Sequence, residues 1–315
     1  MLSFPEGFFQ AEIRNDFQID TTMKTVWAAE LEVLSEFATV CERHGLTWYM
    51  AFGSLLGAVR HQGFIPWDDD IDIWMKRKDY MKFLEIAPGE LPAGYVVRSP
   101  LLEEGYPEYH TCVANSSAIS IEPEHLKRFH GCPFIVGIDV FPLDYLADQD
   151  ELQVMIFKAA RQGALMVKNG ETGEELSAIL TLLEKQCDVT IARTYLENPA
   201  SAEAQQELTA GLWGLANEIA MLGGETQTQR TAMFLDYVKY DKFYESQWFE
   251  ETNYLTFEGF EVPVPGEYDK ILSATYGNYK VGIRNVAQHG YPFYKKQVEQ
   301  LRKYVAEVEA AGKRE

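Results

Sequence analysis

Apolar residues recur every three or four positions after Asp20 and stop at Gly45. This spacing is typical of one buried face of an amphipathic helix. Asp20 or Thr21 is a suitable N-terminal cap, and Gly45 is a suitable stop. The pattern therefore predicts a long helix whose buried face carries Met23, Trp27, Leu31, Leu34, Ala38 and Cys41.

Shorter apolar runs follow this helix and predict strands. The run Leu46–Phe52 predicts a strand, and a short helix is then expected to end near Gln62, with Gly63 as its stop. Residues Lys78–Ile86 are expected to be helical and Pro88–Gly94 to form a loop. Later strand-like runs are Tyr95–Arg98, Tyr109–Ala114, Ala118–Ile121 and Phe134–Phe141. The alternation predicts an α/β (α+β) protein with a mixed sheet flanked by helices.

The composition changes after Asp148, where Ala, Leu, Glu and Gln become frequent as far as Lys242. We expect three or four helices there, forming an insertion or subdomain. The predicted domains are therefore a core over residues 1–147, a helical segment over 148–242 and a C-terminal part over 243–315 that completes the core. The C-terminal part should contain a hairpin of Tyr254–Phe257 with Phe260–Val264, and helices at Tyr268–Tyr276 and Phe293–Ala311.

The charge of the chain excludes some classes of partner. With a net charge of −20 over 315 residues, nucleic acid is not an expected partner, because neutralising phosphates requires clustered Lys and Arg. Its four cysteines form no C-x-x-C pair, which argues against a zinc site and suits a reducing compartment. The chain shows no signal-peptide pattern and no integral membrane segment, so a cytoplasmic protein is expected.

The most informative stretch lies between Gly53 and Ile73. Gly53-Ser54 at a strand-to-helix junction would offer backbone N–H groups to a phosphate. Asp68, Asp69, Asp70 and Asp72 then follow within five positions. In a strand, Asp70 and Asp72 would share one face. Paired carboxylates of this kind bind Mg²⁺, or Mn²⁺, together with substrate phosphates.

Rival interpretations of these aspartates fit less well. A calcium-binding EF-hand loop would need a glycine after Asp72 and a glutamate at its twelfth position, where Ile73 and Asp79 stand. A glycosyltransferase DxD motif leaves Gly53-Ser54 unexplained. The two motifs, with 15 residues between Ser54 and Asp70, resemble the hG[GS]…Dh[DE]h signature of the polymerase-β-type nucleotidyltransferases.

A third carboxylate is expected on a neighbouring strand. Asp139 lies within the apolar, β-branched run Phe134–Phe141, which predicts a buried strand. An ionised carboxylate there is costly unless it is paired or metal-bound. Asp139 is therefore a candidate metal ligand or general base, and the sequence does not separate the two roles.

Longer strings resemble the LicD family of phosphocholine transferases, which also includes the fukutin-like alditol-phosphate transferases. The resemblance rests on the run Tyr49–Tyr80, above all on Ile65–Ile73, and on a second block, Gly137–Asp144. A weaker C-terminal block runs from Val262 to Gly277, followed by Arg284 and His289. The resemblance implies a nucleotidyltransferase-type sheet with an α-helical insertion.

It also implies a reaction. Phosphocholine would pass from CDP-choline to a sugar hydroxyl of a glycan, lipid-linked glycan or teichoic acid precursor, and CMP would be released. Asp70, Asp72 and Asp139 would be catalytic and bind the metal. Three alternatives stay open: an alditol-phosphate transferase using CDP-ribitol or CDP-glycerol, a small-molecule nucleotidyltransferase, and a catalytically degenerate binding protein.

Further residues are candidates for substrate binding. Arg60 is a plausible phosphate clamp, although it also suits a helix C-terminus. Trp67 could offer an aromatic face to a quaternary ammonium. Asp68 and Asp69 are expected to orient the metal ligands or to cap the loop at Trp67. Gly53 and Ser54 complete this set, together with His289 from the C-terminal block.

Overall fold

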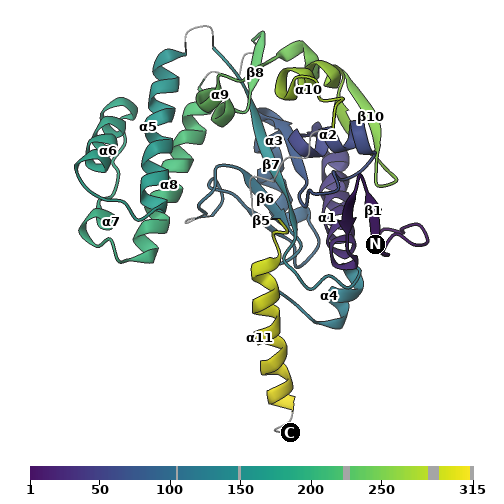
Figure 1. The fold of residues 1–315 in the computed structure, drawn as a ribbon. Helices are drawn as coiled ribbons and strands as arrows, with labels where there is room; N and C mark the ends of the chain where they lie inside the picture. Colours follow the sequence, from purple (N-terminus) through teal and green to yellow (C-terminus); the bar gives the residue numbers. More distant parts are fainter. Residues whose placement is uncertain (104–105, 148–149, 223–227, 283–290, 313–315) are drawn as a thin grey trace.

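A computed structural model describes the chain apart from residues 104–105, 148–149, 223–227, 283–290 and 313–315, and the side chains of 307–312. At its centre is a mixed sheet, with helices packed on it (Figure 1). The mixed α/β class predicted from the sequence is confirmed. None of the described helices combines the length and the apolar character that a bilayer-spanning segment needs.

In the described part of the chain the main sheet has seven strands, five of them in the order β3-β4-β7-β6-β5. Strand β4 pairs with β7 in parallel, whereas β3–β4, β6–β7 and β5–β6 are antiparallel. Strand β8 continues the sheet beside the end of β7, and β9 pairs with β8. The strands are β3 (Trp48–Met50), β4 (Asp72–Lys76), β5 (Val96–Arg98), β6 (Thr111–Ala114), β7 (Gly137–Tyr145), β8 (Arg230–Ala232) and β9 (Tyr244–Glu245).

Helix α1 (Thr21–His44) is the long helix expected from the apolar spacing. The Asp20 side chain accepts the Met23 N–H at 2.7 Å, and Gly45 ends the helix at φ 63°, a conformation that glycine adopts without strain. The predicted helix and both of its ends are therefore confirmed. The helix is buried around most of its circumference, because α3 (Arg77–Glu90) and strands of the sheet both contact it.

Two hairpins lie outside the main sheet. Strands β10 (Thr252–Phe257) and β11 (Phe260–Pro265) form the hairpin that was predicted, and β1 (Glu12–Arg14) pairs with β2 (Phe17–Ile19). The remaining helices near the sheet are α2 (Phe52–His61), α4 (Pro123–Arg128), α9 (Phe234–Tyr240), η1 (Ser246–Phe249) and α10 (Tyr268–Tyr276).

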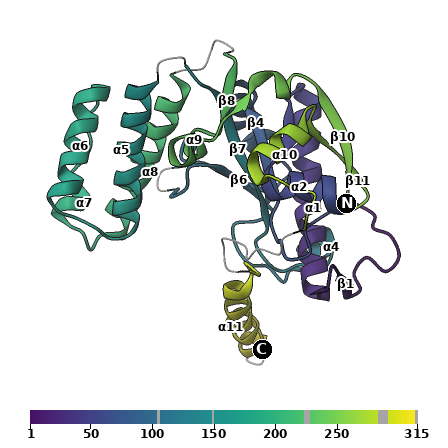
Figure 2. The same ribbon diagram turned by 45° about the horizontal axis from the view of Figure 1, so that its top comes forward.

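Four helices form a group of their own beside the sheet: α5 (Glu151–Lys168), α6 (Glu174–Cys187), α7 (Thr194–Glu197) and α8 (Ala202–Met221). In Figures 1 and 2 they stand apart from the sheet, and a second hydrophobic cluster lies between them. Helix α11 (Lys295–Gly312) projects from the body in both views.

Some local predictions were wrong. Residues Ala118–Ile121 form no strand; they belong to a connection in which Ser120 N–H donates to the Pro133 carbonyl. The loop expected at Pro88 begins later, because α3 runs on to Glu90 with Pro88 inside it. The strand expected at Leu46–Phe52 is only Trp48–Met50, since Phe52 already belongs to α2.

Candidate functional site

The register of β4 and β7 brings the predicted carboxylates together. Asp72, the first residue of β4, pairs with Asp139 of β7, and Asp139 N–H donates to the Ile71 carbonyl at 2.9 Å. Asp70 precedes the strand by two residues. Burial, and then the charges of Asp70, Asp139 and Asp68, raise the pKa of Asp72 well above its usual value. Four carboxylates thus share one region of negative charge.

The first turn of α2 is attached to these aspartates. Asp72 N–H donates to Ser54 Oγ at 2.9 Å, and Ser54 Oγ in turn reaches the Asp70 carbonyl at 3.4 Å. Gly53 touches the Asp68 carboxylate so closely that a Cβ there would lie 2.7 Å from Asp68 Oδ2. The Ser54 hydroxyl therefore orients the carboxylate segment, and the Asp68 carboxylate lies against the start of α2.

The other two aspartates of the motif are held by neighbouring segments. Asp69 is fully buried, and its Oδ2 accepts the Phe293 N–H at 2.6 Å. The Asp68 carbonyl accepts the Trp27 indole N–H at 3.2 Å. Asp69 thus links the aspartate loop to the segment that leads into α11, and Asp68 lies between α1 and α2. His289, also predicted for this site, lies outside the described residues.

Two residues that were not predicted from the sequence, His110 and Glu30, also lie near these carboxylates. His110 Nε2 lies 3.3 Å from Asp139 Oδ2. Burial lowers the pKa of His110, but the Asp139 carboxylate outweighs burial and the pKa is raised. Glu30 of α1 is buried, and its pKa is raised first by that burial and then by Asp69, Asp70, Asp68 and Asp139. Glu30 could have been recognised as a site residue because it is an acidic residue on the apolar face of the predicted helix. No feature of the sequence around His110 indicates a role in the site.

Arg60 does not lie beside Gly53 and Ser54. It occupies the opposite end of α2, about 10 Å along the helix axis from Gly53. There Arg60 and Trp67 border one cavity of about 700 Å³, together with Arg14, Asn15, Asp16, His61, Lys280 and Gly282. The Arg60 guanidinium donates to the Tyr279 carbonyl at 3.2 Å, and its Nε is buried without a partner in the described structure. Arg14, Arg60 and Lys280 line the same cavity as Trp67, and their positive charges disfavour binding of a quaternary ammonium there.

The donor set suits a hard divalent cation. Carboxylate oxygens from two adjacent segments meet where burial and like charges make ionisation costly, and a bound cation would relieve that cost. Within the described residues no group of three or more His, Cys, Asp or Glu side chains is placed to hold a metal alone. Mg²⁺ commonly takes one or two carboxylates and completes its shell with waters and substrate phosphates.

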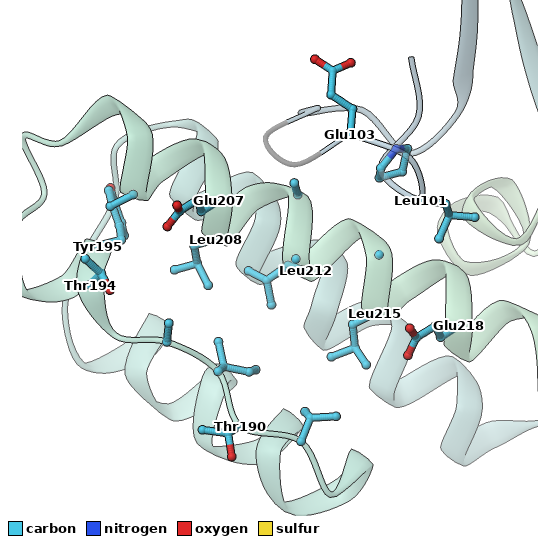
Figure 3. A pocket seen from close by; sticks show the side chains of 18 of the residues that line it. Leu101, Glu103, Thr190, Thr194, Tyr195, Glu207, Leu208, Leu212, Leu215 and Glu218 are labelled. Atoms are coloured by element: carbon cyan, nitrogen blue, oxygen red, sulfur yellow. The ribbon is translucent and has the colours of Figure 1, made fainter. Parts of the chain in front are cut away.

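A separate groove of about 640 Å³ runs along α8, facing residues 189–195 and the loop after β5 (Figure 3). Its lining is mainly apolar, with Glu103, Glu207 and Glu218 among the polar side chains. Among the described residues that line it there is no Lys, Arg or His, so it has no side chain suited to phosphate. The groove therefore belongs to the helical group and not to the carboxylate site.

Part of the chain is similar to known proteins. Residues 45–121 match the family model described as LicD/FKTN/FKRP, nucleotidyltransferase domain. The lipopolysaccharide cholinephosphotransferase LicD of Haemophilus influenzae is 46% identical over 56 residues, covering 18% of this chain and 21% of that protein. An uncharacterized protein of Rickettsia typhi is 35% identical over 85 residues, covering 25% of this chain and 28% of its own.

A second uncharacterized protein, from Rickettsia prowazekii, is 35% identical over 66 residues, which cover 21% of this chain and 25% of its own length. The aligned stretches thus span 21% to 28% of these three relatives. The matched segment includes α2, the aspartate run from Asp68 to Asp72, and β4, whereas Asp139 lies beyond it. Residues 45–121 of this chain are thus similar to the nucleotidyltransferase domain of the LicD family.

Proposed function

We propose that this protein is a divalent-metal-dependent phosphotransferase that moves phosphocholine from CDP-choline to a sugar hydroxyl of a glycan and releases CMP. The observation that carries the proposal is the pairing of Asp72 with Asp139 beside the first turn of α2. Asp72 and α2 lie within the segment that matches the LicD family model, and Asp139 lies beyond it. The name of the similar Haemophilus influenzae protein, a lipopolysaccharide cholinephosphotransferase, supports phosphocholine as the group transferred, and the CDP-linked donor is part of the proposal.

The chain's own groups would bind and orient the diphosphate. Backbone N–H groups at the start of α2 favour phosphate through unpaired donors and the helix dipole. Ser54 holds the backbone of Asp70 and Asp72, so that the carboxylates keep their direction when substrate binds. A Mg²⁺ held by Asp70 and Asp72, with Asp139 either as a further ligand or as the base, would neutralise charge on the diphosphate.

In the transfer step the acceptor hydroxyl oxygen forms a bond to the phosphorus of phosphocholine. The bond from that phosphorus to the bridging oxygen breaks, and the electron pair leaves with CMP. Asp139 is proposed either to accept the hydroxyl proton or to hold the metal, and in both cases His110 Nε2 lies 3.3 Å from its Oδ2. In this type of transfer, negative charge spreads over the phosphoryl oxygens. Most of the rate enhancement therefore comes from positioning the two substrates and from neutralising that negative charge.

The test is calorimetric titration of the full chain with CDP-choline, CDP-ribitol, CDP-glycerol and CTP, with and without Mg²⁺. We expect CDP-choline to bind more tightly with Mg²⁺ and to yield CMP when a glycan acceptor is present. Asp70→Asn should reduce turnover about 10-fold or more while the fold is retained. Asp188→Asn, which changes an exposed carboxylate after α6, serves as the matched control.

Other outcomes would redirect the assignment. Preference for CDP-ribitol or CDP-glycerol would make the protein an alditol-phosphate transferase. Pyrophosphate release from CTP would make it a nucleotidyltransferase. Binding of CDP-choline without turnover would indicate a degenerate binding protein, and near wild-type activity of Asp70→Asn would contradict the role given to the aspartates.

A further inference from the structure

A lysine from a distant part of the chain lies over the first residue of α2. Lys242 Nζ is 5.9 Å from the centroid of the Phe52 ring. Lys242 follows the end of α9 and precedes β9, well outside the segment that matches the LicD family model. Its side chain is half-buried. The fold therefore places a cation next to the helix start that the aspartates contact.

Phe52 is held firmly over the face of the sheet that carries the carboxylates. Its ring lies 4.9 Å from that of Trp74 and 5.4 Å from that of Phe141, both edge to face. Trp74 and Phe141 come two residues after Asp72 and Asp139, so each shares a sheet face with its aspartate. Phe52 also adopts φ 41°, a costly conformation for a bulky residue, which these contacts must stabilise.

Lys242 lacks a close counter-ion in the described structure. Among the described residues, Asp236 is the acidic residue that acts on the Lys242 ammonium. Burial lowers the pKa of Lys242, and Asp236 offsets this only in part. A half-buried ammonium without a close partner gains stability when an anion binds beside it.

We propose that Lys242 is a phosphate-binding residue of this site, whose ammonium contacts the diphosphate of the nucleotide donor. The inference rests on the proposed function, because it assumes a diphosphate between the aspartates and the first turn of α2. Asp68, Asp70, Asp72 and Asp139 repel such an anion, so a fixed positive charge on the Phe52 side balances part of that repulsion.

The test compares Lys242→Met and Lys242→Arg with Lys239→Met in the chain of 315 residues. Lys239 is a matched control because it lies on α9, influences the same Asp236 and has its ammonium 4.5 Å from the exposed Tyr240 ring. Each variant is titrated with CDP, inorganic pyrophosphate and cytidine in the presence of Mg²⁺. Circular dichroism establishes that each variant is folded.

Lys242→Met should bind CDP and pyrophosphate about 10-fold more weakly, because a charge-assisted contact is lost. Cytidine, which has no phosphate, should bind as before. Lys242→Arg should keep most of the affinity for CDP, and Lys239→Met should keep all of it.

Two results would overturn the inference while the proposed function stands. In one, Lys242→Met binds CDP as tightly as the wild type. In the other, its affinity for cytidine falls as much as its affinity for CDP, which would indicate a structural role. If the wild type itself binds neither CDP nor pyrophosphate with Mg²⁺, the proposed function fails and the inference fails with it.

Discussion

The buried ion pair between Arg77 and Asp144 should dominate the stability of the junction between the sheet and the helical group. Arg77 Nε and Nη2 donate to the two oxygens of Asp144 at 2.7 and 2.8 Å, and Nη1 donates to Asn217 of α8 at 3.1 Å. Arg77 is 8% exposed and Asp144 is 0% exposed. One guanidinium thus joins α3, β7 and α8.

Arg77→Met leaves the Asp144 charge buried without its partner. Breaking a buried pair on one side typically costs about 3–5 kcal/mol. That is a large share of the roughly 5–15 kcal/mol that stabilises most proteins. Replacing both charges, as in Arg77→Met with Asp144→Leu, should recover more than half of the loss, because no buried charge remains.

Urea denaturation followed by circular dichroism measures these differences. Arg43→Met is the control, because Arg43 is half-exposed and pairs with Glu90 at the surface, so its loss should cost no more than about 1 kcal/mol. A loss below about 1 kcal/mol for Arg77→Met would show that water solvates this pair as it does a surface pair. Failure of the double variant to recover stability would show that packing, and not charge burial, decides the effect.

Two further predictions concern the site. Ser54→Ala should lower kcat/KM about 10- to 100-fold and the free energy of unfolding by about 1–3 kcal/mol, because the Asp72 N–H loses its acceptor. Steady-state kinetics and urea denaturation measure the two effects, and an unchanged kcat/KM would refute the prediction. Burial, and then Arg60 and Arg14, lower the pKa of His61 to about 4. The folded state therefore resists protonation of His61, and stability should fall as pH drops from about 6.5 towards 4. His61→Gln should lose less Tm than the wild type between pH 7 and pH 4.5, and parallel losses would contradict this.

Local features of the fold could be predicted because they depend on neighbours in the chain. The Asp20 cap, the apolar spacing of α1 and the stop at Gly45 act within a few residues of one another. The β10–β11 hairpin likewise depends on a short turn at Glu258-Gly259. The strand expected at Ala118–Ile121 failed for the opposite reason, since a short apolar run becomes a strand only where a neighbouring strand has room to pair with it.

The carboxylate site also combines features that could be predicted from the sequence with features that could not. Asp70, Asp72 and Asp139 could be identified as candidate metal ligands from their residue type and spacing. The pairing of Asp72 with Asp139 depends on parallel strands whose partners lie 67 residues apart in number, from 72 to 139. Glu30 lies on α1 and His110 lies just before β6, and their positions in the chain do not reveal that both come near these aspartates. The position of Lys242 after α9 likewise does not reveal that its ammonium lies over the Phe52 ring.

The sequence by itself therefore determined the mixed α/β class, the main helices, the hairpin and the chemical types of the candidate ligands, because propensity, capping and apolar periodicity act over a few residues. Only the tertiary structure decided that Ser54 holds the aspartate backbone, that Arg60 borders a cavity with Arg14 and Lys280, and that Arg77 joins the sheet to α8. Those arrangements depend on how separate elements pack against one another, which is set by the burial of whole faces and not by any short run of residues.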